Sequence, residues 1–333
     1  MRKHLLPLLA LLCALLLPAA ALGETIVTSF FPIYLFARNL TEGVDDLEVV
    51  CLTPPSSGCL HDYQLQTGDM KRLARADVFL INGAGMEPYL ANVTAAFPEL
   101  PIVDASVGIA LLESCVEHDH DHGSHEESHD HDEHEDDGHD EHDHEAEGHD
   151  HEAELSGHDE HEYNAHIWLD ADNAVTMVRN LADGLIARYP QHADAIADNR
   201  DAYILRLTAL DAELSAAVSA LPHADVITSH EAFPYFAQAY GLHVVGILNR
   251  EPEDALSPRA LAALCGTVTE LGNPPLFTEP QYDDAAARTI SRETGAPVFV
   301  LDPIVTGPDD VPLTYYEDVM RANVQVLLEA LSN

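Results

Sequence analysis

The segment that most constrains the fold is residues 117–162, because its composition prevents it from forming a packed structure. It contains 22 Asp and Glu residues, no Lys or Arg, and almost no apolar side chain. Such a segment cannot bury enough surface to offset the entropy lost on ordering, so we expect a disordered loop inserted into a folded chain. Its fourteen histidines are His118, His120, His122, His125, His129, His131, His134, His139, His142, His144, His149, His151, His158 and His161.

Histidine-rich tracts of this kind indicate metal binding. Neutral imidazole is a good ligand for zinc, copper and nickel, and the carboxylates between the rings attract any divalent cation. The alternative is a solvated acidic linker with incidental histidines, although such linkers usually recruit Lys, Ser, Pro and Gln. We therefore predict an auxiliary loop that binds several metal ions weakly.

The charge balance of the whole chain argues against a nucleic-acid partner. The sequence has 15 Lys and Arg against 58 Asp and Glu, a net charge of −43, and about half of that charge lies outside the loop. Such a surface repels nucleic acids and anionic membranes and attracts cations.

The first 23 residues read as a signal peptide. Arg2 and Lys3 supply the positive start, an apolar run covers residues 5–17, and small residues at 19–23 predict cleavage just before Glu24. A membrane anchor is the alternative, but the run is short for a spanning helix. Lipidation would use Cys13, which lies inside the apolar run after Leu12, where a small residue is expected. We expect an exported protein, in the periplasm or on the extracellular face of the cell membrane.

Four cysteines follow the signal peptide, and export makes disulfides permissible. Cys51 and Cys59 flank a turn-rich stretch, Pro-Pro-Ser-Ser-Gly, and we predict that they form a bridge that braces the loop before His61. Cys115 and Cys265 either pair or stay buried.

Strands alternate with helices of about ten residues along both flanks of the loop, which predicts βαβ units and parallel sheets. We assign residues 24–190 to an N-terminal lobe. Its expected strands are 25–29, 47–52, 77–81 and 101–103, and its expected helices are 33–41, 67–76, 86–97 and 173–189.

A long helix then follows, with no Gly or Pro from 193 to 221 and apolar residues spaced by three, four and seven. We interpret residues 191–221 as a rigid linker between two lobes. The C-terminal lobe covers 222–333, with expected strands 225–228, 243–247, 275–278 and 298–301 and helices 234–240, 257–271, 284–294 and 315–331. The predicted fold is α/β: two Rossmann-like (β/α)4 lobes with parallel sheets, one linker helix, and a metal site in the cleft between the lobes.

Three histidines outside the loop have informative neighbours. His61 follows the second expected strand, His166 precedes a helix, and His230 ends an apolar strand, where ligands bind in open α/β sheets. Glu279 and Asp302 end two later strands in the same way. Three imidazoles and one carboxylate make a complete zinc site, although each residue alone could be structural.

Other polar residues lack such settings. We interpret His192, His223 and His243 as surface or packing residues, and Glu231 as a support for His230 and not a ligand.

These residues lie in motifs that resemble the substrate-binding proteins of bacterial zinc and manganese ABC importers, the ZnuA-like family. The resemblance covers nearly all of the mature chain. The motifs are TSFFPIY at 28–34, HDYQL at 61–65, DMKRL at 69–73, HIWLD at 166–170, HEAFPYF at 230–236, FTEPQ at 277–281 and LDP at 301–303.

The resemblance implies two α/β lobes on a long rigid helix, and it implies that His61, His166 and His230 are metal ligands. The fourth ligand varies in the family; we favour Asp302, with Glu279 or water as alternatives. Leu60 stands where some zinc-binding members place a carboxylate. A histidine at position 230 favours zinc, because manganese-binding members tend to have the harder Glu oxygen there.

The resemblance further implies a monomer that binds Zn²⁺ and delivers it to a membrane permease with its cytoplasmic ATPase, with the histidine-rich loop as zinc collector or sensor. The alternatives are manganese, iron or nickel on the same scaffold, an extracellular zinc buffer, or a zinc hydrolase. The hydrolase would need a positioned general base, and the sequence has no His-Glu-x-x-His motif.

Overall fold

The structure is a computed structural model that describes residues 23–54, 57, 60, 63–114, 163–221, 224–248, 256–308 and 310–332. Several predictions lie outside these residues: the signal peptide, the histidine-rich loop, His61, Cys59, Cys115 and His223. Within the described part, no helix combines the length and the apolar composition that a membrane span requires.

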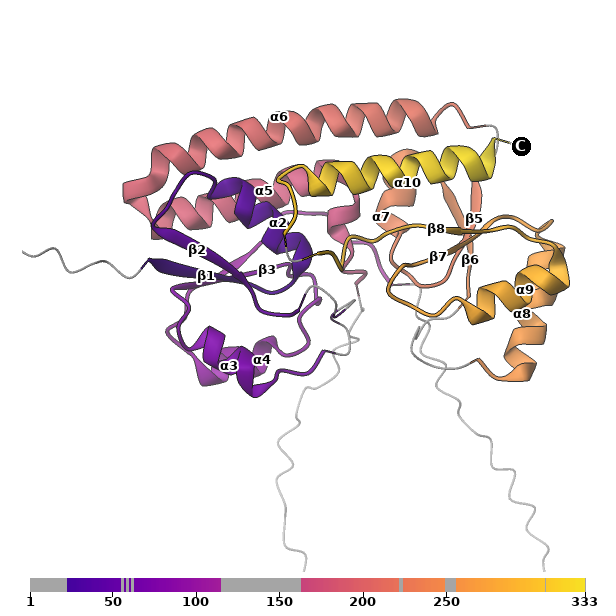
Figure 1. Ribbon diagram of the computed structural model, residues 1–333, viewed down its shortest axis with the longest axis horizontal. Coiled ribbons are helices and arrows are strands. Elements are labelled where there is room, and N and C mark those ends of the chain that lie inside the picture. Colours follow the sequence, from indigo (N-terminus) through magenta and orange to yellow (C-terminus); the bar gives the residue numbers. More distant parts are fainter. Residues whose placement is uncertain are drawn as a thin grey trace, which may run out of the picture.

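The N-terminal half forms a parallel sheet of four strands in the order β2-β1-β3-β4 (Figure 1). Short apolar runs form these strands: β1 (Glu24–Thr28), β2 (Leu47–Cys51), β3 (Val78–Ile81) and β4 (Ile102–Asp104). The helices that accompany them are α2 (Phe31–Leu40), α3 (Thr67–Leu73), α4 (Leu90–Ala96) and α5 (Ala171–Arg188).

The C-terminal half repeats this arrangement with the strand order β6-β5-β7-β8, again parallel. Its strands are β5 (Asp225–Thr228), β6 (His243–Ile247), β7 (Leu276–Thr278) and β8 (Val298–Val300). Its helices are α7 (Pro234–Tyr240), α8 (Pro258–Glu270), α9 (Ala285–Thr294) and α10 (Tyr315–Leu331). The predicted α/β class with two parallel sheets is therefore confirmed.

Helix α6 (Ala193–Val218) lies along both halves, with α10 beside it (Figure 1). At about 1.5 Å per residue its 26 residues extend ~39 Å. Its buried side chains recur on one face: Ile196, Tyr203, Leu207, Leu210, Leu214 and Val218. The C-terminal helix α10 packs against both α6 and α2, so the two halves are held together by more than the linker that the sequence predicts. The lobe boundaries stay a prediction.

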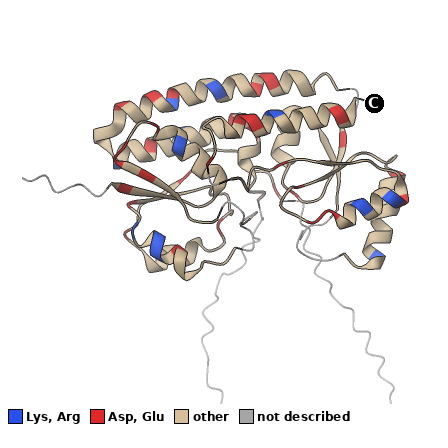
Figure 2. Ribbon diagram, viewed as in Figure 1, with Lys and Arg blue, Asp and Glu red and all other residues tan. Residues whose placement is uncertain are grey.

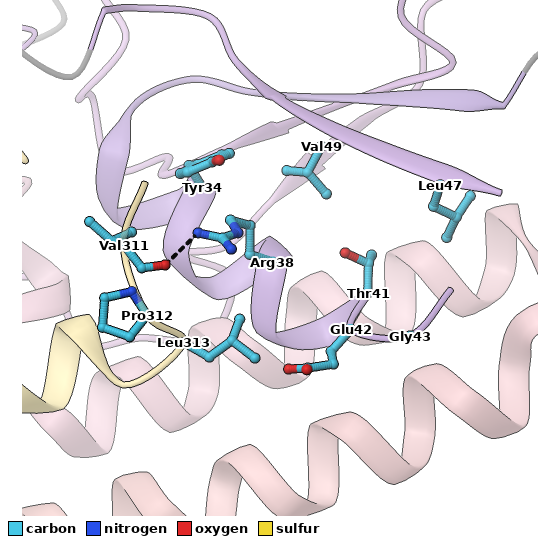
Figure 3. Close-up of a pocket in the computed structure, with 10 residues that line it drawn as sticks. All are labelled: Tyr34, Arg38, Thr41, Glu42, Gly43, Leu47, Val49, Val311, Pro312 and Leu313. Atoms are coloured by element: carbon cyan, nitrogen blue, oxygen red, sulfur yellow. Dashed lines mark hydrogen bonds between the residues drawn. The ribbon is translucent and has the colours of Figure 1, made fainter. Parts of the chain in front are cut away.

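A loop from the C-terminal half also crosses onto the N-terminal half. In Figure 3 the Arg38 side chain of α2 reaches the 311–313 segment, where its Nη1 donates to the Val311 carbonyl at 2.8 Å. Asn39 Nδ2 donates to the Leu313 carbonyl at 3.0 Å. A cavity of about 440 Å³ opens between this segment, α2 and β2.

The first residue of two helices depends on the contacts of one nearby side chain. Helix α5 begins at Ala171, two residues before the predicted start, because the Asp170 carboxylate caps it by accepting from the Asp172 amide at 2.9 Å. Helix α4 begins at Leu90, four residues after the predicted start. Glu87 is turned instead toward the backbone amides of Asn82 and Gly83.

The predicted bridge between Cys51 and Cys59 is not formed, because Cys51 carries a free thiol. Burial raises the pKa of the Cys51 thiol to about 11, although the neighbouring side chains of Thr28 and Thr53 oppose the increase. Cys265 is also free. Acidic side chains outnumber basic ones over both halves and along α6 and α10 (Figure 2), in line with the composition.

Candidate metal centre

Three of the predicted ligands follow neighbouring strands of the second sheet. His230 follows β5, Glu279 follows β7 and Asp302 follows β8, and these strands are adjacent in the order β5-β7-β8. Because parallel strands end at the same edge of a sheet, the three side chains belong to one edge, as the sequence predicts.

His166 comes from the other half of the chain. It precedes a 3-10 turn, η1 (Ile167–Leu169), and its side chain is buried, with 2% exposed. Trp168 anchors this turn, because it is fully buried and its Nε1 donates to the Pro303 carbonyl at 2.8 Å. The Tyr316 hydroxyl donates to the Trp168 carbonyl at 2.7 Å. The backbone that carries His166 is thus tied to the second half.

The structure brings His166 and His230 together. Their ring centres lie 5.1 Å apart with an interplanar angle of 75°, and His230 is 6% exposed. In a tetrahedral zinc site each donor nitrogen lies ~2.05 Å from the ion, and the centre of its ring lies ~1.15 Å further along the same line. Two such ring centres are then about 5.2 Å apart. The observed separation therefore suits two imidazoles on one ion.

Glu279 lies beside His230. Its Oε1 is 3.4 Å from His230 Nδ1, and its Oε2 accepts a hydrogen bond from Gln281 Nε2 at 2.7 Å. It is 3% exposed. A carboxylate in contact with Nδ1 orients the imidazole so that Nε2 faces elsewhere, which is the usual arrangement behind a metal-bound histidine.

Asp302 is held in a compact loop. Its Oδ1 accepts from the Ile304 amide at 2.7 Å, and its backbone amide and carbonyl both bond to the Asn323 side chain. Burial raises the pKa of the Asp302 carboxyl; the Ile304 amide opposes this increase and the charge of Glu279 adds to it. A cation bound here would offset both the burial and the repulsion.

The other histidines predicted as ligands cannot be located relative to this pair. His61 and the fourteen loop histidines lie outside the described residues. Within the described ranges, no group of three His, Cys, Asp or Glu side chains has the geometry to hold a metal ion. His243 is on the surface beside Asp225, and His192 faces Asp46 at 3.9 Å, in keeping with the surface and packing roles predicted for them.

The site contains residues that the sequence analysis missed. Asn164, Tyr235 and Ser114 link the segments of the two histidines: the Tyr235 hydroxyl donates to the Asn164 carbonyl, and Ser114 Oγ donates to Glu231 Oε2 at 2.8 Å. The proximity of Asn164 to His166 in the sequence is a weak signal, and Tyr235 lies within the HEAFPYF motif, which does not indicate its role. Nothing in the sequence indicates Ser114.

A second contact, from Asn82, holds the backbone next to His166. Asn82 follows β3, and its Nδ2 donates to the Ala165 carbonyl at 3.0 Å. The Asn82 amide in turn donates to Glu87 Oε1 at 2.8 Å. These buried bonds connect the first sheet to the backbone of His166.

A comparison with protein families matches residues 26–330 to the model described as "ZnuA: Zinc-uptake complex component A periplasmic". The zinc-binding protein AdcA of Streptococcus pyogenes serotype M3 is 27% identical over 305 residues, which cover 91% of this chain and 55% of that protein. The chain therefore spans about half the length of this relative.

Solved structures show the same fold. A crystal structure of ZnuA aligns with a TM-score of 0.70 at 23% identity, covering 93% of this chain and all of that one. The substrate-binding protein FpvC from Pseudomonas aeruginosa, in complex with Mn²⁺, aligns with a TM-score of 0.70 at 25% identity, covering 92% of this chain and 98% of that one.

Proposed function

This chain belongs to the ZnuA family of zinc-uptake components, and from that premise we propose that it binds Zn²⁺ between its two halves and delivers it to the permease of an ABC importer. The observation that carries the proposal is the buried pair of imidazoles, one from each half, 5.1 Å apart at 75°. Members of this family are substrate-binding proteins and not enzymes, so the hydrolase alternative is set aside.

The proposed ligands are His61, His166, His230 and Asp302, with Glu279 as the alternative fourth ligand. Two supports favour Asp302. Glu279 contacts Nδ1 of His230 and is bonded to Gln281, which suits an orienting role. Asp302 is a half-buried carboxyl with a raised pKa, which ionises more readily once a cation is bound.

Zinc is the proposed metal because imidazole nitrogen suits zinc better than manganese, which prefers oxygen ligands. The structural relative FpvC favours a second candidate on the same scaffold, since it is described in complexes with Mn²⁺ and with Ni²⁺. We propose that the loop at 117–162 binds further zinc ions weakly. The signal-like N-terminus, together with a family described as periplasmic, supports export of the protein.

The deciding experiment removes the loop first, so that only the proposed site is measured. A variant lacking residues 119–160 would be dialysed to equilibrium against mixed zinc, manganese and nickel with a moderate chelator. We expect it to retain one zinc ion. Adding His61→Ala, His166→Ala and His230→Ala should abolish retention, whereas the control His192→Ala/His243→Ala should leave it unchanged.

Retention of the same zinc by the triple variant would place the metal elsewhere and end the proposal. Preferential retention of manganese or nickel would favour the second candidate. Delivery is tested separately, by growth of a strain lacking the gene in zinc-limited medium: unchanged growth would argue for a buffering protein and against uptake.

The fourth ligand has its own test, with Co²⁺ in place of zinc. Asp302→Asn should change the visible absorption bands of the bound ion because a ligand is lost. Glu279→Gln should weaken binding but keep the bands. The reverse result would make Glu279 the ligand.

A further inference from the structure

Asn164 occupies an unusual place between the two histidine segments. It lies two residues before His166 and is 4% exposed. Its backbone is held on both sides: its amide donates to the Leu112 carbonyl at 2.9 Å, and its carbonyl accepts from the Tyr235 hydroxyl, also at 2.9 Å. The same hydroxyl accepts from the Leu112 amide. The Asn164 side chain is therefore presented from a fixed backbone.

The orientation of its side-chain amide follows from two partners that do not depend on the imidazole. Nδ2 lies 2.8 Å from the Glu231 carbonyl oxygen, which can only accept, so this atom must be the NH₂ group. Oδ1 lies 3.0 Å from the backbone amide of His166, which can only donate. The amide oxygen therefore faces His166.

That oxygen also lies 3.2 Å from Nδ1 of the His166 ring. An amide oxygen can only accept, so the ring nitrogen in contact with it must carry the proton. A neutral imidazole has one N–H, and the proton on Nδ1 leaves the lone pair on Nε2.

From these contacts we infer that Asn164 is a positioning residue for the proposed metal site: its amide keeps the His166 proton on Nδ1, so that Nε2 is the nitrogen offered to zinc. This inference rests on the proposed function. The same amide donates to the backbone carbonyl of Glu231, the neighbour of His230. One side chain therefore selects the donor nitrogen of His166 and also connects the His166 segment to the His230 segment.

Glu279 stands beside the same ring nitrogen of the second histidine. Its Oε1 lies 3.4 Å from Nδ1 of His230, which is longer than the 3.2 Å contact between Asn164 Oδ1 and His166 Nδ1. The neighbour of Nδ1 is thus a neutral amide at one ring and a carboxylate at the other. Removing such a partner typically costs 10–100-fold in metal affinity.

The primary test needs no substitution. Nitrogen-15 NMR of the metal-free protein, labelled in histidine and recorded at about pH 8.5, where imidazole is ordinarily neutral, distinguishes a protonated from an unprotonated ring nitrogen. We expect Nδ1 of His166 to be protonated and Nε2 to be unprotonated. The opposite tautomer would overturn the inference, whether or not the protein retains zinc.

Three variants then connect the tautomer to binding. Asn164→Leu should give a mixture of tautomers and about 10–100-fold weaker zinc binding in a chelator competition. Asn164→Asp keeps an acceptor toward Nδ1 and should restore the wild-type tautomer. The matched control is Asn180→Leu in α5, where Asn180 Nδ2 donates to the carbonyls of Ala105 and Val107; it should change neither measurement.

Wild-type tautomer and affinity in Asn164→Leu would overturn the inference. If instead the wild-type protein bound no zinc, the proposed function would fail, while the NMR measurement would still report on the tautomer. The two failures are therefore distinguishable.

Discussion

The buried carboxyl of Glu87 should make the protein less stable as the pH rises. Glu87 is 5% exposed, and its two oxygens accept from the amides of Asn82 and Gly83 at 2.8 and 3.1 Å. Burial raises its pKa from the ordinary 4.5 to about 7; the nearby Ser29 side chain and the two amides oppose the increase, and the charge of Asp104 adds to it.

The sign and size of the effect follow from this shift. Between pH 4.5 and about 7 the folded state holds the Glu87 proton that the unfolded state has released. The unfolded state then binds fewer protons, so the free energy of unfolding falls as pH rises. The stability contributed by the protonated carboxyl is complete below the unfolded pKa and is lost through the folded pKa. A shift of this size corresponds to about 3 kcal/mol.

The assay is urea unfolding of the metal-free protein from about pH 4.5 to 8.5, because bound zinc would add stability of its own. The measured quantity is the unfolding free energy of wild type minus that of Glu87→Gln, since other titrating groups cancel in the difference. This difference should fall by about 3 kcal/mol across the range. Glu99→Gln, at an exposed position, should change stability by under about 0.5 kcal/mol.

A difference that stays flat, or that rises with pH, would refute the reasoning. The size of the difference at any single pH carries less information than its change with pH, because glutamine places an NH₂ group against one of the two amide donors. That mismatch lowers the stability of the variant at every pH by about 1–3 kcal/mol.

Three further predictions concern packing and thiol chemistry. Leu210→Ala, at a fully buried position of α6, should lower the free energy of unfolding by about 2–5 kcal/mol in urea melts, whereas Leu205→Ala, 73% exposed on the same helix, should change it by under about 0.5 kcal/mol. Gly307→Ala places a methyl group 2.3 Å from an aromatic ring of α2 and should cost about 1–3 kcal/mol, whereas Gly266→Ala in α8, with open space around it, should stabilise by about 0.5–1 kcal/mol. Because burial raises the pKa of Cys51 to about 11, its thiol should resist a thiol reagent at about pH 8 in the native protein and react after unfolding; lasting protection in denaturant would mean that it is bonded to another sulfur.

Local patterns predicted both sheets, because a short apolar run between turn residues has few other ways to bury its side chains. The same patterns located the strand ends, and with them the edge that carries His230, Glu279 and Asp302. Helix starts were less predictable, because they depend on a single side chain. Asp170 could have served as a cap from the sequence alone, whereas the bonds of Glu87 to the backbone at 82–83 appear only in the folded chain.

The histidines proposed as ligands stand out in the sequence by their settings, but the residues that support them do not. Asn164 and Glu231 are 67 residues apart in the sequence, and their bond exists only because the two halves pack against each other. The bond of Trp168 to the Pro303 carbonyl, 135 residues away, has the same origin. Residue type and spacing indicate which atoms can bind a metal; the choice of ring nitrogen depends on contacts between distant segments.

The packing of α10 also constrains how a metal ion can enter or leave. Phe36 of α2 and Tyr316 of α10 are fully buried, with ring centres 5.3 Å apart. Exposing one such ring costs about 4–6 kcal/mol at ~25 cal/mol per Å², so separating the two helices would cost on the order of 10 kcal/mol. That is comparable with the whole stability of a typical domain. We therefore expect exchange of the ion to involve the loops at the strand ends, while α2, α6 and α10 stay packed.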